Sequence, residues 1–193
     1  MVNAARRPGD GPRQAQAIFT ATLELLAERG YDGLTMEGVA ARSGVHKTTI
    51  YRWWTDKDAL LGAALLNSAL LELPAPDTGT LRGDLLALTG HVLRLLTTEP
   101  SASVITAALT AAGRPVLSRL AHEFFADRLA GELVIFDRAR QRGEIAADID
   151  PKLVVDLLAG AMWTRVLLRQ EQPPPGFAAQ AVDLVLTALG WSG

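Results

Sequence analysis

The chain has no cysteine among its 193 residues, which excludes disulfide bonds and thiolate metal sites and fits a reducing compartment. No apolar run approaches the roughly 20 residues that a membrane-spanning helix needs. The N-terminal stretch MVNAARRPGDGPRQ lacks the apolar centre of a signal peptide. We therefore expect a cytoplasmic protein that does not enter a membrane.

Catalytic and cofactor motifs are also missing. The chain contains no HExxH metal motif, nucleophile elbow, phosphate-binding loop or dinucleotide fingerprint. We expect neither an enzyme nor a bound metal or cofactor. The net charge of −2 does not by itself indicate a nucleic-acid partner.

Alanine and leucine dominate the 49% of residues that are hydrophobic, and aromatic residues make up only 6%. This composition favours packed helices over sheets. Prolines and glycines divide the sequence into segments with helical spacing of apolar residues. We predict an all-α fold of about nine helices, over residues 13–29, 35–43, 46–54, 55–73, 80–97, 101–112, 115–142, 151–169 and 177–189.

The stretch TMEGVAARSGVHKTTIYRWWTDK reads as two short helices joined by a tight turn. Thr35 is a good N-cap for the first helix, and Gly44 tolerates the left-handed backbone of a sharp turn. In the second helix, Ile50 and Trp54 lie on one side for burial. Two helices joined in this way form a helix-turn-helix unit, whose second helix enters the DNA major groove.

This stretch resembles the N-terminal signature of the tetracycline-repressor (TetR) family of bacterial transcription regulators. The residues that carry the resemblance are Thr35, Val39, Ala40, Gly44, Val45, Thr49, Ile50, Tyr51, Trp54 and Lys57. The resemblance is strong over residues 13–60 and only architectural beyond them. It implies a DNA-binding head followed by a helical domain for effector binding and dimerisation.

The resemblance also implies DNA contacts. Base edges would face residues 47, 48, 49 and 52, which are Lys47, Thr48, Thr49 and Arg52. Tyr51, Lys57 and Thr35 would hold phosphates. For Thr49, capping or packing stays open as an alternative.

Three positions depart from the usual pattern of the family. His46 stands where a serine commonly caps the recognition helix, and when protonated it can reach a phosphate. Trp53 replaces a common phosphate-binding histidine and offers one indole N–H. Ser43 replaces a typical alanine.

We expect three parts: a disordered arm over residues 1–12, a DNA-binding domain over 13–58, and an effector-binding and dimerisation domain over 59–193. Residues 1–58 carry 8 Lys/Arg and 7 Asp/Glu, a net charge of +1. Residues 59–193 carry 11 and 14, a net charge of −3. This difference supports DNA binding only weakly, so the motif is the basis of the prediction.

The C-terminal half offers side chains for an apolar effector pocket, namely His91, His122, Phe125, Met162 and Trp163. Histidines and aromatics at helical spacing are more often part of an ordinary core, and that interpretation stays open beside the pocket. The apolar surroundings predict a hydrophobic or amphipathic effector.

Apolar residues occupy most of the circumference of the last two helices. Each helix must therefore pack against other protein surface on two sides. The resemblance implies that they form a four-helix bundle with their copies in a homodimer. The residues expected at this interface are Leu157, Ala161, Leu168, Val182, Val185 and Leu189. Such a dimer would present two recognition helices about 34–36 Å apart to a near-palindromic operator in double-stranded DNA.

We therefore expect a homodimeric TetR-like repressor that a small molecule releases from its operator. Two alternatives stay open. An all-helical enzyme or lipid carrier with a vestigial head would show turnover or ligand binding without specific DNA binding. A DNA-binding protein whose C-terminal half binds another protein would have no small-molecule inducer.

Overall fold

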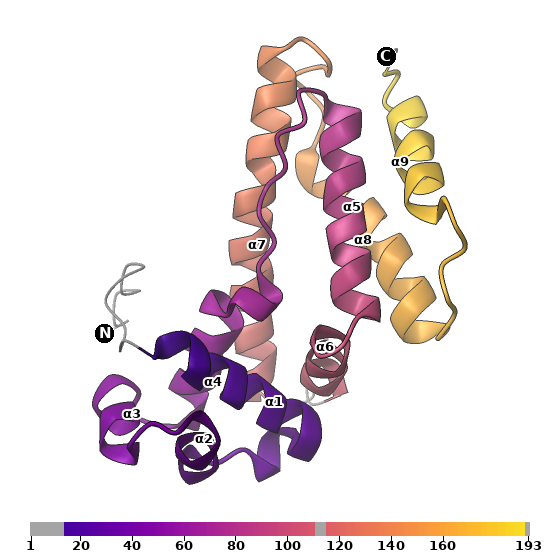
Figure 1. Ribbon diagram of the computed structural model, residues 1–193. Helices are drawn as coiled ribbons and strands as arrows, with labels where there is room; N and C mark the ends of the chain where they lie inside the picture. The colour runs from indigo at the N-terminus through magenta and orange to yellow at the C-terminus, as the bar shows by residue number, and fades with distance from the viewer. Residues whose placement is uncertain (1–13, 111–114, 192–193) are drawn as a thin grey trace. The chain divides into compact units, whose positions relative to one another are not determined.

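The computed structural model describes residues 14–110 and 115–191. In that part of the chain it contains nine α-helices and no strand, which confirms the all-α prediction (Figure 1). The helices are α1 (Ala15–Gly33), α2 (Met36–Ser43), α3 (Lys47–Trp53), α4 (Lys57–Asn67), α5 (Leu81–Thr97), α6 (Ser101–Thr110), α7 (Pro115–Gln141), α8 (Pro151–Trp163) and α9 (Phe177–Ala188). None of these described helices is both long and apolar enough to cross a membrane. The expected arm at residues 1–12 lies outside the described residues.

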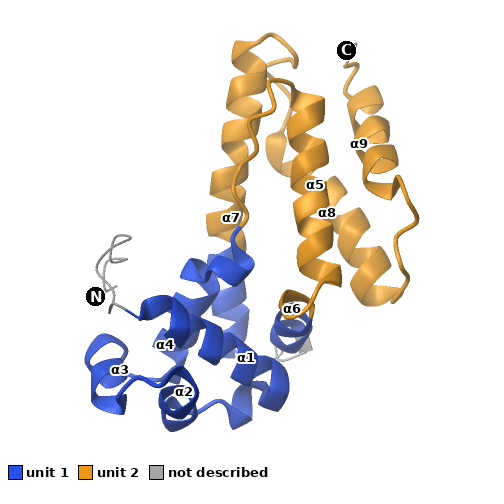
Figure 2. Cartoon of the chain, viewed as in Figure 1, with its two compact units in different colours: residues 1–72, 103–124 blue, residues 73–102, 125–193 orange. Residues whose placement is uncertain are grey.

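The chain divides into two compact units (Figure 2). The first contains residues 1–72 and 103–124, and the second contains residues 73–102 and 125–193. The first unit thus includes α4 and α6 together with the helix-turn-helix segment. Where the DNA-binding domain ends stays a prediction.

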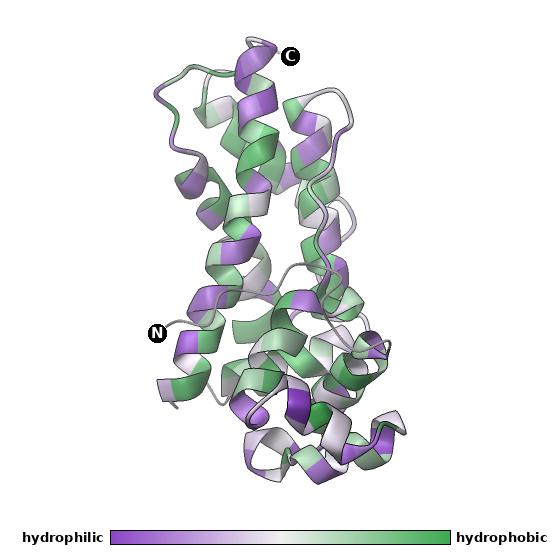
Figure 3. Cartoon of the chain, turned by 90° about the vertical axis from the view of Figure 1, so that its left-hand side faces the viewer, coloured by the Kyte–Doolittle hydropathy of each residue, from purple (hydrophilic) through white to green (hydrophobic). Residues whose placement is uncertain are grey.

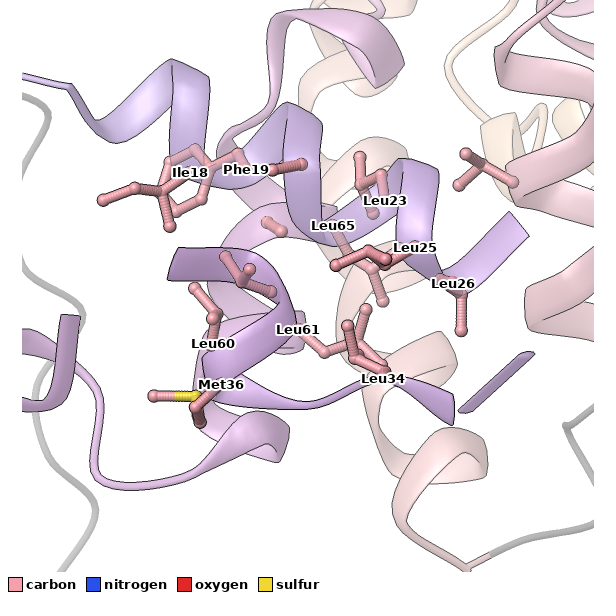
Figure 4. Packing of buried hydrophobic residues seen from close by; sticks show 14 of the residues in the cluster. Ile18, Phe19, Leu23, Leu25, Leu26, Leu34, Met36, Leu60, Leu61 and Leu65 are labelled. Atoms are coloured by element: carbon pink, nitrogen blue, oxygen red, sulfur yellow. The ribbon is translucent and has the colours of Figure 1, made fainter. Parts of the chain in front are cut away.

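The core of the first unit is built mainly by α1 and α4. Figure 4 shows Leu23 and Leu26 of α1 together with Leu60 and Leu61 of α4, and each of these side chains is at most 1% exposed. Burial of one such side chain stabilises a fold by about 1.5–3 kcal/mol. This core provides the rigid support on which α2 and α3 rest.

The C-terminus of α1 and the N-cap of α4 differ from the prediction. Gly30 has a φ of 65°, as a helix-ending glycine should, yet helical structure resumes after it and α1 ends at Gly33. Asp56, rather than the expected Thr55, caps α4 by accepting a hydrogen bond from the Ala59 N–H at 2.8 Å.

The predicted end of α4 near residue 73 is also wrong, because the helix ends at Asn67. The side chain of Gln16, on α1, donates to the Asn67 carbonyl at 2.8 Å and accepts from the Ala69 N–H at 3.0 Å. Ser68 accepts from the Leu70 N–H and starts a short 3-10 turn, Ala69–Leu71. The side chains of Gln16 and Ser68 therefore form the backbone hydrogen bonds that a longer helix would have formed.

The second unit packs α5, α8 and α9 against one another and against the C-terminal part of α7. Its core includes Leu85, Phe136 and Leu158, and green apolar segments alternate with purple polar ones along the helices (Figure 3). Asp150 caps α8 through the Lys152 N–H, as predicted. The expected helix to residue 169 instead ends at Trp163 and continues as a π-helical turn, Thr164–Leu168.

Candidate nucleic-acid interface

The turn between α2 and α3 has the geometry that the sequence predicts. The Thr35 hydroxyl oxygen accepts a hydrogen bond from the Gly38 N–H at 3.0 Å and so caps α2. Gly44 adopts φ 70° and ψ 11°, a left-handed conformation that glycine reaches without strain. Val45 follows and is buried, which anchors the turn in the core. The segment is a helix-turn-helix.

One side of α3 is held against the core. Ile50 is fully buried, and the ring of Trp54 meets that of Phe19 edge-on, with 5.6 Å between their centroids. His46, at the N-cap, makes no side-chain cap bond, although its carbonyl accepts from the Thr49 N–H at 2.9 Å. Its imidazole is therefore not needed to start the helix.

The opposite side of α3 is exposed and polar. The exposed side chains at and along this helix are those of His46, Lys47, Thr48, Tyr51 and Arg52. Thr49 is half-buried at its edge, so packing and base contact both remain compatible with its place. Because the buried side holds the helix in position, this polar side faces outward as a fixed row.

The cations of the head have unequal availability. Arg42 forms a two-bond ion pair with Glu28, at 2.5 and 2.6 Å, and lies 3.6 Å from Glu24. The Arg42 hydrogen bonds lower the pKa of Glu28. By contrast, Lys47 and Arg52 make no hydrogen bond or ion pair with any residue that the structure describes. Among the described residues of α3, these two are therefore the cations free to meet DNA.

Lys57, which is expected to hold a phosphate, contacts Tyr31 in the structure. Its ammonium donates to the Tyr31 carbonyl at 2.9 Å and lies 4.0 Å from the centroid of the Tyr31 ring. The Tyr31 hydroxyl in turn donates to Asp58 at 2.5 Å. Lys57 therefore helps to fix the start of α4, and a phosphate contact would have to share this ammonium.

Trp53 and Thr35 present their donors differently. Trp53 is half-buried, and its indole nitrogen is shielded from solvent. A phosphate contact through this N–H would require the side chain to turn outward. The Thr35 oxygen is occupied as a cap acceptor, while its hydroxyl proton remains able to donate.

Sequence reasoning missed one residue at this surface. Glu37, in the first turn of α2, accepts a hydrogen bond from the Tyr51 hydroxyl at 3.3 Å. Burial of the phenol and the charge of Glu37 both raise the pKa of Tyr51. The two residues are 14 positions apart on different helices, so no periodicity could have connected them.

The five expected effector residues do not form one group. Phe125 and Trp163 are in ring contact, with centroids 5.1 Å apart, and Met162 is fully buried. His91 is half-buried, and its Nδ1 is buried without a hydrogen-bond partner among the described residues. Burial, with the charge of Arg94, lowers the pKa of His91. His122 is exposed and belongs to the first unit, whereas the other four belong to the second.

The expected interface residues of α8 and α9 divide by exposure. Leu157 is 53% exposed and Leu168, in the turn after α8, is 79% exposed. Ala161, Val185 and Leu189 are half-buried. Val182 lies in the core of its own unit and is not available to a partner.

Two further exposed leucines lie on the same helices, in addition to the six residues expected at the interface. Leu153, on α8, is 57% exposed and Leu184, on α9, is 72% exposed. Leu153 precedes Leu157 by one helical turn, so it was accessible to sequence reasoning. Leu184 follows Val182 by two positions, which places it on another side of the helix.

The described residues contain no group of three His, Asp or Glu side chains that could hold a metal ion.

The candidate site is a helix-turn-helix whose second helix exposes cations, hydroxyls and an imidazole. This arrangement is typical of DNA-binding proteins, in which the second helix of the unit is the recognition helix.

Comparison with known families agrees with this geometry. Residues 18–64 match the family described as "Bacterial regulatory proteins, tetR family". Residues 75–185 match the family described as "Tetracyclin repressor-like, C-terminal domain". The chain belongs to the tetR family and is a transcriptional regulator, which sets aside the enzyme alternative.

Individual relatives cover nearly the whole chain. The HTH-type transcriptional regulator Mb1581 of Mycobacterium bovis is 36% identical over 193 residues, covering 96% of this chain and 94% of that protein. The DNA-binding transcriptional repressor TetR of Mycobacteroides abscessus is 33% identical over 181 residues, covering 93% and 95%.

Solved structures show the same fold. The TetR family transcription regulator SCO0332 is 32% identical, with a TM-score of 0.70, covering 93% of this chain and 97% of its own. FadR from Bacillus subtilis, solved in complex with stearoyl-CoA, is 20% identical with a TM-score of 0.65, covering 89% and 97%. At that identity the likeness is one of fold alone.

Proposed function

We propose that this regulator is a homodimeric repressor that binds a near-palindromic operator and responds to a small molecule. The observation that supports it most is the exposed polar row of α3, held in place by buried Ile50 and by Trp54. A DNA-binding regulator acts where the chromosome is, and we therefore place it in the cytoplasm.

The proposed DNA contacts divide into base readers and phosphate holders. Lys47 and Arg52 can each donate to guanine edges, and the threonine hydroxyls can donate or accept. The proposed base readers are Lys47, Thr48, Thr49 and Arg52. The proposed phosphate holders are Thr35, His46, Tyr51, Trp53 and Lys57, with Lys57 and Trp53 requiring a change of partner or rotamer.

Substitution of Lys47 and Arg52, the two unpaired cations of α3, tests this assignment. Lys47→Ala and Arg52→Ala should each cost about 1–3 kcal/mol of binding if the side chain reads a guanine, and should relax specificity at that position. Arg119→Ala, which removes an exposed cation from α7, is the matched control. Unchanged discrimination among operator variants after both changes would refute the assignment.

The proposed dimer uses the exposed apolar side chains of α8 and α9. Leu153, Leu157 and Leu184 are each more than half exposed, which is costly for leucines that no partner covers. A two-fold dimer would bury each residue against its own copy or a neighbour on the partner. Two recognition helices about 34–36 Å apart would then match successive major grooves.

Dimerisation can be tested on these leucines. Leu157→Glu and Leu184→Glu should shift the protein from dimer to monomer in sedimentation velocity and weaken operator binding. Val134→Glu, at a side chain on α7 that is 45% exposed, is the control for adding a surface carboxylate. A dimer that survives both leucine changes would place the interface elsewhere.

The effector would bind in the second unit. The buried, unpartnered Nδ1 of His91 offers a polar contact, and the Phe125 and Trp163 rings offer apolar surface. FadR of Bacillus subtilis, which has the same fold, was solved with stearoyl-CoA, an amphipathic ligand. We infer a hydrophobic or amphipathic effector, which must bind the operator-free conformation better than the operator-bound one to cause release.

A further inference from the structure

We propose that Glu37 weakens the affinity of the α3 surface for DNA in general, by engaging the Tyr51 hydroxyl and by placing a carboxylate beside Lys47. The inference rests on the proposed function only in taking Tyr51 and Lys47 to face DNA. It assigns to this regulator a built-in element that opposes sequence-independent binding.

The geometry brings the carboxylate onto the recognition surface. The Tyr51 hydroxyl donates to Glu37 Oε1 at 3.3 Å, from α3 to α2. An open depression of about 330 Å³ lies at the turn between these helices, and its lining includes Glu37, His46 and Lys47. Glu37 is exposed, so an approaching phosphate meets its charge as well as that of Lys47.

The local charge balance makes this one carboxylate important. On α2 and α3 the charged side chains are Glu37, Arg42, Lys47 and Arg52. Glu28 and Glu24 already neutralise Arg42. On these two helices, therefore, two unpaired cations, Lys47 and Arg52, are opposed by one carboxylate, that of Glu37.

The hydrogen bond from Tyr51 to Glu37 opposes phosphate binding in a second way. A phenol has a single proton to donate. If Tyr51 gives it to a phosphate, Glu37 loses its donor and its carboxylate is left close to another negative charge. Phosphates carry no sequence information, so this opposition acts on operator and random DNA alike. Base contacts can then decide where the protein stays bound.

The test uses the full-length protein and a short duplex of arbitrary sequence, about 20 base pairs long, in fluorescence anisotropy at about 50 and about 200 mM salt. Glu37→Gln removes the charge and keeps an acceptor for Tyr51. It should tighten binding on the order of fivefold at the lower salt, and steepen the salt dependence by about one counterion. Glu123→Gln makes the same charge change at an exposed position on α7 and should leave binding nearly unchanged.

Two further variants test the part played by Tyr51. Glu37→Asp keeps the charge but is one methylene too short to reach the phenol, so it should tighten binding less than Glu37→Gln. The neutral amide of Glu37→Gln accepts a weaker hydrogen bond from Tyr51 than the carboxylate does, so part of the gain from Glu37→Gln comes from this weakening. In a Tyr51→Phe background that part is absent and the gain should shrink to the charge effect alone. Equal gains in both backgrounds would overturn the role of the hydrogen bond.

Unchanged or weaker duplex binding by Glu37→Gln would overturn the proposal. Loss of operator affinity with duplex binding unchanged would also overturn it, since Glu37 would then be reading a base such as cytosine through its amino group. Arg52→Ala, measured beside it, separates this from the proposed function. If Arg52→Ala weakens duplex binding while Glu37→Gln does not strengthen it, only the role of Glu37 fails.

Discussion

Glu132 should make this protein less stable as the pH rises towards neutrality. The residue lies on α7 in the second unit and is only 7% exposed. Burial raises the pKa of its carboxyl from 4.5 to about 7, against the opposing charge of Arg128. Its ionised form is therefore disfavoured in the folded state.

The sign and size of the effect follow from linkage. Below about pH 4.5 the carboxyl is protonated in both states and costs nothing. Between about pH 4.5 and 7 the unfolded chain releases this proton first, so the free energy of unfolding falls as the pH rises. Above about pH 7 the cost is constant at about 3 kcal/mol. Between pH 5 and pH 8 the expected loss is about 2–3 kcal/mol.

Urea unfolding of the wild type and Glu132→Gln, at one protein concentration and at each pH, measures this loss. The difference between the two proteins cancels the contributions of the titratable groups that they share. The free energy of unfolding of Glu132→Gln minus that of the wild type should be about 2–3 kcal/mol larger at pH 8 than at pH 5. Glu123→Gln, at an exposed carboxyl of the same helix, should run parallel to the wild type. Parallel curves for Glu132→Gln would refute the reasoning.

Three further changes in stability can be measured by urea unfolding under fixed conditions. Asp56→Ala should cost about 1 kcal/mol by removing the cap of α4, and Thr55→Ala almost nothing; equal losses would contradict the assignment of the cap. Leu61→Ala should cost about 3–5 kcal/mol, because the side chain is fully buried, and a loss below about 1 kcal/mol would mean that the core collapses around it. Gly44→Ala should cost about 1–2 kcal/mol through its φ of 70° alone, since a Cβ there meets no atom within 4 Å.

Local signals in the sequence were sufficient for the helix-turn-helix. Thr35 as a cap, the left-handed Gly44 and the buried Ile50 depend on residues within a few positions, and the structure has all three. Asp150 as the cap of α8 is a prediction of the same kind, and it is confirmed. Such features follow from propensity and periodicity without knowledge of distant contacts.

Features that depend on distant partners were not accessible. Thr55 and Asp56 are both good N-cap residues, and the structure uses Asp56. The next two residues, Lys57 and Asp58, both bind Tyr31, which is distant in the sequence. The end of α4 is set by Gln16, which is more than 50 positions away. Periodicity showed that α9 is apolar but not which side meets its own core.

The same limit applies at the recognition surface. Lys47 and Arg52 could be proposed from their spacing on one helix. Their availability, and the engagement of Lys57 by Tyr31, required the packed head. In the sequence, Glu37 is an acidic residue in the first turn of a helix, where a favourable interaction with the helix dipole is enough to explain its presence. Its contact with Tyr51 therefore could not be predicted.

Sequence-specific DNA binding by a dimer is the central claim, and fluorescence anisotropy tests it most directly. The duplex is the DNA that flanks the protein's own gene, compared with a scrambled duplex at two salt concentrations. The account predicts tight binding to the native fragment alone, with two protomers per site and loss of discrimination in Lys47→Ala and Arg52→Ala. Equal, weak and strongly salt-dependent binding to both duplexes would contradict it, because only phosphate electrostatics would then remain.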